Sequence, residues 1–416
     1  MSDYGKEASM IPRALGKQAK QLAQWFPVVS ITGPRQSGKS TLAKAMFPDY
    51  DYVNLENPET RKAAIDDPVG FIRQRPSKLI VDEAQYAPDL FSMIQVASDE
   101  RSEQGQYVLS GSQNFLLLKR IQQSLAGRVG LVKLLPFSFQ EACKANQALT
   151  PDTFMLQGGY PRIYDTRMPL NLFFSNYIDT YIERDVSEYL DVRNLADFRR
   201  FLTLCALSSG ALINYTNIAN ELGVSPRTVK AWMSILESSY IAFHLMPFYT
   251  NARKQVVKTP KLYFYDTGLL CHLLGIRTVE ALVAHPKFGD IFENLIIAET
   301  MKQHLNANQE PQLFFYRDAS KVEVDLLDFT DPNNRMLIEI KSGQTYHDRF
   351  ARHLTLIGNV LGIPCEQQYV TSRVEHSYVS QGIRVTSTPR LAGRPTVKSR
   401  RRTITILHNR RIPPEF

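Results

Sequence analysis

The stretch Gly33-Pro34-Arg35-Gln36-Ser37-Gly38-Lys39-Ser40 has the spacing GxxxxGK[ST] and gives the first prediction of the fold. It follows the apolar run VVSIT at 28–32 and precedes a helical pattern that begins with Ser40 and Thr41. Glycines let the backbone turn so that its N–H groups face phosphate oxygens, and the N-terminus of the next helix adds partial positive charge. We therefore predict that residues 33–41 bind ATP, with Lys39 on the β and γ phosphates and Ser40 on Mg2+.

Two carboxylates follow the apolar segment LIV at 79–81. In nucleotide hydrolases, one acid at such a strand end holds the Mg2+ shell and a second group orients the attacking water. We predict the metal role for Asp82 and the catalytic water role for Glu83. The later strand YVLSGS at 107–112 ends in polar side chains, so Ser112 or Gln113 is expected at the γ phosphate, and capping of a helix is the alternative.

The pattern of apolar and polar residues changes three times along the chain. Short apolar runs alternate with helical stretches up to about residue 140, which predicts an α/β fold with a mostly parallel sheet and crossover helices. The next part is mainly helical, and after it a helix, three strands, a second helix and a strand predict a small α/β unit. We expect a P-loop domain at 1–145, a helical region at 146–285, an α/β domain at 286–375 and a basic, disordered tail at 376–416.

Several strings resemble the AAA module of prokaryotic AAA+ superfamily ATPases that carry a C-terminal domain of unknown function. They are IPRALGKQ, VVSITGPRQSGKSTLAKAMFP, YVNLENPETR, LIVDEAQ, LSGSQNFLL and SLAGRVGLVKLLPFS. The later strings GGYPR, YIERDV, KLYFYDTGLL, FENLI, EVDLL and IEIKSG resemble that C-terminal domain. The resemblance covers roughly residues 10–345, and it implies ATP binding and hydrolysis.

Arg128, in SLAGRV, lies where this family has an arginine. The resemblance implies an arginine finger that acts on nucleotide in the same or a neighbouring subunit, and the second case implies a homo-oligomer. A surface ion pair is the alternative, and Arg162 in GGYPR is a weaker candidate for the same role.

Residues 215–232, YTNIANELGVSPRTVKAW, predict a helix, a tight turn at Gly223 and a second helix. Ser225 is expected as the N-cap and Pro226 at the first helical position. The apolar spacing leaves Arg227, Thr228 and Lys230 outward, where they would face the major groove of duplex DNA. The apolar residues that follow suit the strands of a winged helix, a unit that also serves as a lid or a protein contact.

Acidic residues and a lysine alternate with apolar residues in the third segment. Because side chains alternate between faces of a strand, Asp325, Glu339 and Lys341 are expected to meet, with Glu293 joining from the preceding helix. Carboxylates that bind Mg2+ beside a lysine are what hydrolysis of a phosphodiester requires. The pattern resembles the restriction-endonuclease-like superfamily, and we predict Glu293, Asp325 and Glu339 as metal ligands. A retained fold without cleavage is the alternative.

The net charge of +8 lies entirely in the last 41 residues, where nine basic residues face one acid, Glu415. No apolar run approaches the length of a membrane span, and the first residues lack the apolar stretch of a secretory signal, so we expect a cytoplasmic protein without a membrane partner. Four widely spaced cysteines indicate neither a zinc site nor a disulfide framework.

Two functions fit these patterns. The first is a Mg2+-dependent ATP hydrolase whose nucleotide state positions a winged helix and a nuclease-like domain on duplex DNA. The second is an ATP-gated switch that binds a protein partner and carries an inactive nuclease-like domain. A metabolic kinase is disfavoured, because Glu83 next to Asp82 suits water activation and no lid for an acceptor substrate is apparent.

Overall fold

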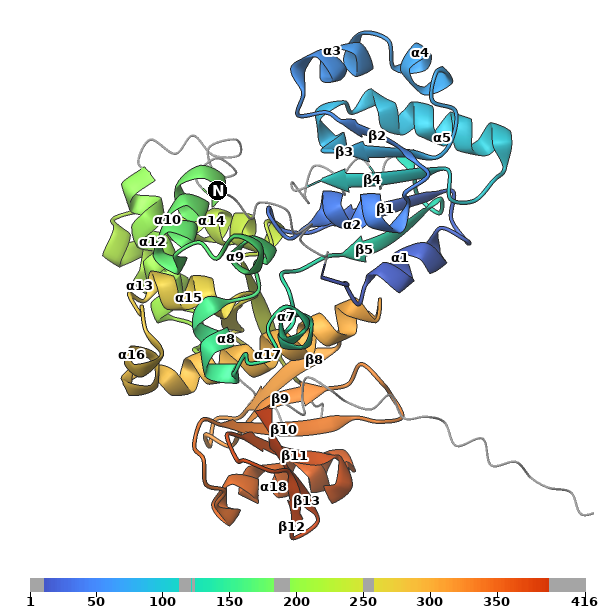
Figure 1. Cartoon of the computed structure of the whole chain (residues 1–416). Helices are drawn as coiled ribbons and strands as arrows, with labels where there is room; N and C mark the ends of the chain where they lie inside the picture. The colour runs from blue at the N-terminus through green and yellow to red at the C-terminus, as the bar shows by residue number, and fades with distance from the viewer. Residues whose placement is uncertain (1–10, 112–120, 122–123, 183–194, 250–257, 389–416) are drawn as a thin grey trace, which may run out of the picture.

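The computed structural model describes residues 11–111, 121, 124–182, 195–249 and 258–388. Figure 1 shows three parts: a sheet flanked by helices at the upper right, a group of helices at the left, and a mixed sheet at the bottom. Within the described residues, no helix is both long and apolar enough to cross a membrane.

The first part is a five-stranded parallel sheet, as the alternation of apolar runs and helices predicts. Its strands run in the order β2-β3-β4-β1-β5. They are β1 (Val28–Thr32), β2 (Asp51–Asn54), β3 (Leu79–Asp82), β4 (Tyr107–Gly111) and β5 (Val129–Lys133). The helices are α1 (Gly16–Leu22), α2 (Lys39–Met46), α3 (Pro58–Asp66), α4 (Pro68–Arg73) and α5 (Asp89–Arg101), with a short 3-10 helix η1 (Ala84–Tyr86).

Helices cover both faces of this sheet, so its strands are buried on each side. Val28 packs into one core with the side chains of α4 and α5, whereas its neighbour Val29 packs into the other with those of α1 and α2. Side chains alternate between faces with period two, and a strand that is buried on both faces therefore needs the continuous apolar run that β1 has.

The second part is helical. It contains α7 (Phe139–Ala145), α8 (Pro151–Gln157), α9 (Pro161–Thr166), α10 (Leu170–Tyr177), the π-helix η2 (Ile178–Ile182), α12 (Leu195–Leu207), α13 (Tyr215–Leu222), α14 (Pro226–Ser238), α15 (Thr267–Leu273) and α16 (Val279–Ala284). Gly223 follows α13 with a left-handed φ of 69°, and the Ser225 hydroxyl accepts a hydrogen bond from the Thr228 amide, with Pro226 at the first position of α14. The predicted turn and N-cap are thereby confirmed.

The third part is an eight-stranded mixed sheet in the order β12-β13-β11-β10-β9-β8-β6-β7. The strands are β6 (Ala242–Pro247), β7 (Lys261–Phe264), β8 (Leu313–Arg317), β9 (Glu323–Asp328), β10 (Met336–Lys341), β11 (Gln368–Ser372), β12 (Tyr378–Ser380) and β13 (Ile383–Ser387). The helices are α17 (Phe288–Asn306) and α18 (Arg352–Leu361), with 3-10 helices η3 (Asp348–Ala351) and η4 (Cys365–Gln367).

The structure differs from two of the expected domain boundaries, the one between residues 285 and 286 and the one at residue 376. β6, from the segment expected to be helical, pairs in parallel with β8 at Met246 and Phe314, so residues 146–285 and 286–375 share one sheet. The expected disordered tail also begins too early, because β13 pairs with β11 and buries Ile383 and Val385. The basic residues from 389 onward lie outside the described residues.

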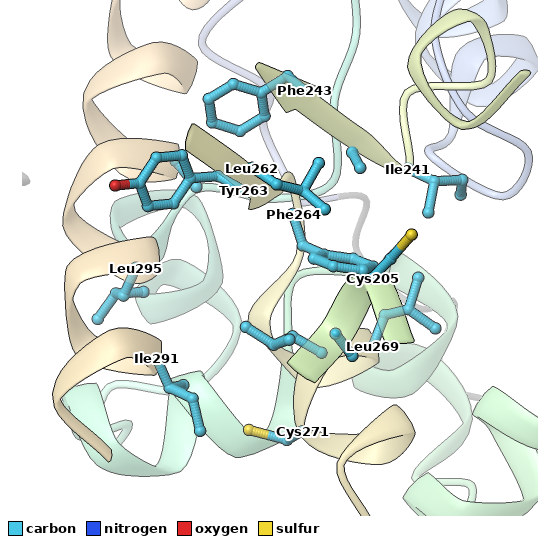
Figure 2. Close-up of a cluster of buried hydrophobic side chains, with 14 of the residues drawn as sticks. Cys205, Ile241, Phe243, Leu262, Tyr263, Phe264, Leu269, Cys271, Ile291 and Leu295 are labelled. Atoms are coloured by element: carbon cyan, nitrogen blue, oxygen red, sulfur yellow. The ribbon is translucent and has the colours of Figure 1, made fainter. Parts of the chain in front are cut away.

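One hydrophobic core joins the helical part to α17. Figure 2 shows Cys205 and Leu269 of the helical part gathered with Phe264 of β7 and with Ile291 and Leu295 of α17. All five are at most 3% exposed. The two expected domains are therefore held together by a common core as well as by a common sheet.

Candidate functional site

The glycine-rich loop lies between the carboxyl end of β1 and the first turn of α2, which is the position in which a parallel sheet binds phosphate groups. A Cβ at Gly33 would lie 2.1 Å from the Leu134 carbonyl oxygen, so no larger residue fits there. Gly38 caps α2 with a left-handed φ of 89°, and Gln36 has a φ of 60°. The backbone of the loop is thus folded tightly around the place predicted for phosphate.

The Lys39 ammonium is buried under the loop. Its Nζ donates to the carbonyl oxygens of Gly33 at 3.1 Å and Pro34 at 2.9 Å. Gln36 Oε1 and Ser37 Oγ are buried without a hydrogen-bond partner in the described part of the chain. A buried cation beside unpaired polar atoms and a tight backbone turn fits a triphosphate, because buried polar groups otherwise carry partners.

Ser40 and Asp82, predicted separately as magnesium ligands, are in direct contact. Ser40 Oγ donates to Asp82 Oδ2 at 2.6 Å, and the Ser110 hydroxyl donates to Asp82 Oδ1. The Tyr52 hydroxyl donates to Asp82 Oδ2 at 2.7 Å. Tyr52 was not predicted, although its place in a strand beside β3 is the signal that could have found it.

Glu83 lies directly after β3 with a left-handed φ of 53°. Its side-chain Oε2 accepts a hydrogen bond from Gln85 Nε2 at 2.5 Å, and its amide donates to Asp82 Oδ1 at 3.1 Å. A left-handed backbone is costly for a non-glycine residue, and such residues persist where the surrounding structure requires them. The two adjacent carboxylates therefore have different partners: Asp82 accepts from Ser40, Tyr52 and Ser110, whereas Glu83 accepts from Gln85.

The other residues predicted to bind the nucleotide do not all lie in one place. Thr41 lines a cavity beside Gly38, while the Arg35 guanidinium lies 3.8 Å from Glu56. Ser112 and Gln113 lie outside the described residues.

Arg128 lies at the wrong end of the sheet to act on nucleotide in its own subunit. Its carbonyl accepts from the Val28 amide at the start of β1, whereas the loop follows the end of β1. Its guanidinium forms a bidentate ion pair with Asp99 at 2.6 and 3.0 Å. The predicted role in the same subunit is therefore wrong, because the length of the strand separates Arg128 from the phosphates.

Arg13 is a contact of the loop that was not predicted as a site residue. Its Nη1 donates to the Ser37 carbonyl at 2.8 Å, its Nη2 to the Leu135 carbonyl at 2.6 Å, and its Nε to Glu141 Oε1 at 3.1 Å. Burial opposes the charge of Glu141, but Arg13 and backbone amides outweigh it and lower the pKa of that carboxyl. Because a guanidinium donates in a fixed planar geometry, this residue forms a rigid link between the loop and α7.

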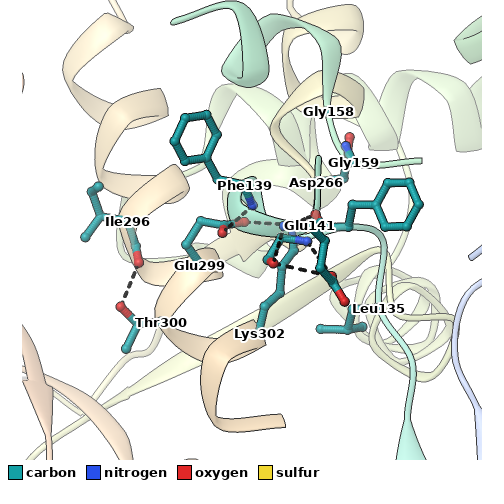
Figure 3. A network of polar contacts seen from close by, with 12 residues as sticks. Leu135, Phe139, Glu141, Gly158, Gly159, Asp266, Ile296, Glu299, Thr300 and Lys302 are labelled. Carbon is teal, nitrogen blue, oxygen red and sulfur yellow. Dashed lines mark hydrogen bonds and ion pairs between the residues drawn. The ribbon is translucent and has the colours of Figure 1, made fainter. Parts of the chain in front are cut away.

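A second buried network continues from this link into α17, as Figure 3 shows. The Phe139 amide donates to Glu299 Oε2 at 2.8 Å, and Lys302 Nζ donates to Glu299 Oε1 at 3.0 Å and to the Phe137 carbonyl at 3.1 Å. Asp266 accepts from the Gly159 amide at 2.7 Å, and it also caps α15. Charged side chains thus fasten the segment after the P-loop domain to the C-terminal part.

The acidic residues predicted in the third segment do meet. Lys341 Nζ lies 2.6 Å from Glu339 Oε1 and 3.4 Å from Asp325 Oδ2, and the Ile340 amide donates to Asp325 Oδ2 at 2.7 Å. Burial and the adjacent Asp325 raise the pKa of Glu339 to about 8. The pairing of β9 with β10 produces this arrangement.

A second lysine in the cluster was missed. Lys261 Nζ lies 3.1 Å from Glu293 Oε1 and 2.7 Å from Glu323 Oε1, and the Tyr263 hydroxyl donates to Glu293 Oε1 at 2.5 Å. Burial and Asp325 raise the pKa of Glu293 to about 7. Lys261 and Tyr263 are two residues apart in β7 and therefore point to the same face of the strand. This spacing is the pattern in the sequence that could have placed both in the cluster.

Lys261 and Lys341 form ion pairs with the residues that were predicted to bind a metal ion. Within the residues that the structure describes, no three His, Cys, Asp or Glu side chains are arranged to hold a metal ion. Lys261 is bound to Glu293, and Lys341 is bound to Asp325 and Glu339. The three predicted ligands therefore form ion pairs with ammonium groups instead of a preformed metal site.

The residues predicted to face DNA lie near the N-terminus of α14. Arg227 and Lys230 are exposed, and the Lys230 ammonium lies 5.6 Å from the ring centre of Tyr215. Thr228 is half-buried, and its hydroxyl lies 2.8 Å from that of Ser225, so it belongs to the helix cap. Arg162 lies in α9 with an exposed side chain.

Three family models match successive segments of the chain. A family model described as an AAA domain matches residues 26–143, and models described as domains of unknown function, DUF8612 and DUF4143, match residues 149–280 and 288–391. The uncharacterized protein Rv2008c of Mycobacterium tuberculosis is 32% identical over 308 residues, which cover 72% of this chain and 67% of that protein. The chain belongs to this AAA-domain family. The resemblance stated from its sequence motifs is thereby confirmed.

Two more distant proteins resemble this AAA-domain protein. The uncharacterized protein MJ1544 of Methanocaldococcus jannaschii is 23% identical over 342 residues, which cover 74% of this chain and 73% of that protein. The solved structure of a Walker-type ATPase, PABY2304 of Pyrococcus abyssi, is 15% identical, covers 65% of this chain and 97% of its own, and has a TM-score of 0.45.

Proposed function

We propose that this protein is a Mg2+-dependent ATP hydrolase that couples its nucleotide state to a C-terminal module acting on duplex DNA. The 2.6 Å contact between Ser40 Oγ and Asp82 Oδ2 carries the first half of this proposal, because it unites the magnesium-binding hydroxyl and carboxylate beneath the glycine-rich loop. Mg2+, when bound to Ser40 and Asp82, would neutralise charge on the β and γ phosphates.

The chain's own groups supply the other requirements of hydrolysis. The N–H groups of the loop and the N-terminus of α2 bind the phosphates, and Lys39 exchanges its carbonyl partners for phosphate oxygens. Glu83 orients the attacking water and accepts its proton. A second subunit could complete the site with Arg128, which is too far from the nucleotide of its own subunit and would act only in a homo-oligomer.

The DNA half of the proposal rests on α13 and α14. These helices and the antiparallel strands β6 and β7 follow one another in the order of a winged helix. Arg227 and Lys230 are exposed near the N-terminus of α14, where a recognition helix contacts a groove. Asp325, Glu339 and Lys341 lie together as in a nuclease-like domain, although Lys341 pairs with both acids.

Two contacts support communication between nucleotide and module. Arg13 links the loop to Glu141 of α7, and the adjoining Phe139 amide binds Glu299 of α17. The Tyr240 hydroxyl, just beyond α14, lies 3.1 Å from the hydroxyl of Thr32, the residue before the loop. Phosphate binding that shifts the loop would therefore act on both α14 and α17.

The test is Mg2+-dependent ATP turnover with and without duplex DNA, measured on the full chain. The Lys39→Ala variant gives the background, and Lys62→Ala, an exposed lysine in α3, is the matched control. We expect turnover that DNA stimulates and that Lys39→Ala abolishes. Turnover that persists in Lys39→Ala would overturn the nucleotide site, and turnover indifferent to DNA would overturn the role of DNA.

The second candidate function is an ATP-gated switch that binds a protein partner and cleaves nothing. The ion pairs of Lys261 and Lys341 with four carboxylates favour it, because the acids that would bind a cleaving metal are paired with ammonium groups. Cleavage of supercoiled plasmid in Mg2+ that Glu339→Gln abolishes would exclude this candidate, whereas ATP turnover that is indifferent to DNA, without cleavage of the plasmid, agrees with it.

A further inference from the structure

A cavity of about 150 Å³ opens beside the glycine-rich loop. The loop residue Gly38 and the α2 residues Thr41 and Leu42 form one wall, and Pro161 of α9 lies in the opposite wall. A Cβ built on Gly38 would lie only 3.8 Å from Pro161 Cγ, so α9 closes directly over the loop. A triphosphate held by the loop would place its nucleoside in this cavity.

The walls of the cavity suit a flat aromatic base. Ile11, Leu42, Phe137 and Pro161 contribute apolar surface, and apolar walls with few polar groups are typical of small-molecule sites. Arg13 also lines the cavity, but its three donor nitrogens are bound to Ser37, Leu135 and Glu141. The arginine is therefore occupied in holding the loop.

Asp165 is the carboxylate at the mouth of this cavity. Its side chain has no hydrogen-bond or ion-pair partner among the residues described, and it is exposed. An ionised carboxylate only accepts hydrogen bonds. At position 6, adenine presents an amino donor. Guanine and hypoxanthine present there a 6-oxo acceptor that a carboxylate repels, and their nearest donor is the adjacent N1–H.

We propose that Asp165 determines the base specificity of the nucleotide site by accepting a hydrogen bond from the 6-amino group of adenine. This inference rests on the proposed ATP site and adds the group that selects adenine over 6-oxo purines. Asp165 lies on α9, outside the glycine-rich loop, so base recognition comes from the helical region and phosphate binding from the P-loop domain.

The experiment compares equilibrium binding of the Mg2+ complexes of the β,γ-methylene analogues of ATP, ITP and 2′-deoxy-ATP to the full chain by calorimetry. We expect the wild-type protein to bind the ATP analogue roughly tenfold more tightly than the ITP analogue. Asp165→Asn should bring the ratio close to one, because its amide can donate to the 6-oxo group. Asp165→Leu should weaken binding of the ATP analogue without weakening that of the ITP analogue.

The outcomes separate this inference from the proposed function. Failure of the wild-type protein to bind either analogue would overturn the ATP site itself. Binding of the ATP analogue with an ATP-to-ITP ratio of one, or a ratio that Asp165→Asn leaves unchanged, would overturn only the role of Asp165. Asp165→Asn could also weaken binding of the ATP analogue but not of the 2′-deoxy-ATP analogue. That result would mean that the carboxylate binds the ribose 2′-hydroxyl, and it would overturn the proposed role in base specificity. Asp66→Asn, on the exposed face of α3, should keep the wild-type ratio.

Discussion

The Thr32 hydroxyl lies 3.1 Å from the Tyr240 hydroxyl, across 208 residues of sequence. Thr32 is the last residue of β1, directly before the glycine-rich loop, and Tyr240 follows α14 by two residues. Tyr240 is buried and has a left-handed φ of 56°, a conformation that a bulky residue adopts only where its surroundings require it. The contact therefore connects the phosphate site to the helix proposed to meet DNA.

Tyr240→Phe should reduce the stimulation of ATP turnover by DNA while leaving basal turnover intact. The variant removes only the hydroxyl, and we expect a decrease of about 1 kcal/mol in the free energy of unfolding. Steady-state turnover with and without DNA checks the first effect, and urea unfolding checks the second. A double-mutant cycle with Thr32→Val isolates the contact, and additive effects in that cycle would mean that the two hydroxyls do not communicate.

Glu83→Gln should bind ATP and hydrolyse it roughly a hundredfold or more slowly, because an amide cannot accept the proton of the attacking water. Nucleotide binding by calorimetry and single-turnover hydrolysis measure the two properties separately. Glu59→Gln, at an exposed position of α3, is the control. Loss of binding in Glu83→Gln would show that Glu83 holds the nucleotide, contrary to its assigned role.

Arg227→Ala and Lys230→Ala should each weaken binding to duplex DNA and reduce the dependence of affinity on salt. Removing one ion pair with a DNA phosphate lowers the slope of log affinity against log salt by about one. Fluorescence anisotropy over a range of salt concentrations measures both quantities, with Lys62→Ala as the control. Slopes equal to that of the wild-type protein would remove α14 from the DNA interface.

Lys261→Met should destabilise the protein by about 3 kcal/mol at neutral pH, because Glu293 and Glu323 lose the buried ammonium between them. The double variant Lys261→Met, Glu293→Gln should recover part of this stability, since one uncompensated carboxylate is neutralised. Urea unfolding of both variants tests the ion pairs. A double variant less stable than Lys261→Met would contradict this account of the cluster.

His272 should make the protein sensitive to mild acid. Burial and the nearby Arg277 lower the pKa of the His272 imidazole to about 4, compared with about 6.5 in an unfolded chain. The unfolded state therefore binds more protons between these values, and the contribution of His272 to stability is present above pH 6.5 and is lost as the pH falls towards 4. His272→Gln should flatten this part of the stability profile, whereas His376→Gln, an exposed histidine, should not. Equal profiles for wild type and His272→Gln in urea unfolding would refute the assignment.

The local parts of this protein follow from the order of its residues. The motif at 33–40 with an apolar strand before it and a helix after it predicts the P-loop domain, because the glycines and the helix start that form that backbone turn are close in sequence. Ser225 and Pro226 predict the start of α14 for the same reason. Period-two alternation likewise places Asp325, Glu339 and Lys341 on one side of paired strands.

Other features depend on contacts between distant segments, which no local pattern contains. Arg128 occupies a familiar motif, yet the direction of β5 puts it at the far end of the sheet from the loop. Lys261 joins the acidic cluster only because β7 lies against α17, and its ammonium then forms ion pairs with Glu293 and Glu323. The sequence by itself determined the phosphate loop and the charged residues of the acidic cluster. Both follow from local hydrogen bonding and strand periodicity, which act over a few residues. Only the tertiary structure decided which charges neutralise one another and which distant side chains contact the phosphate loop, since those outcomes depend on packing between elements far apart in the sequence, as Thr32 and Tyr240 are at 208 residues.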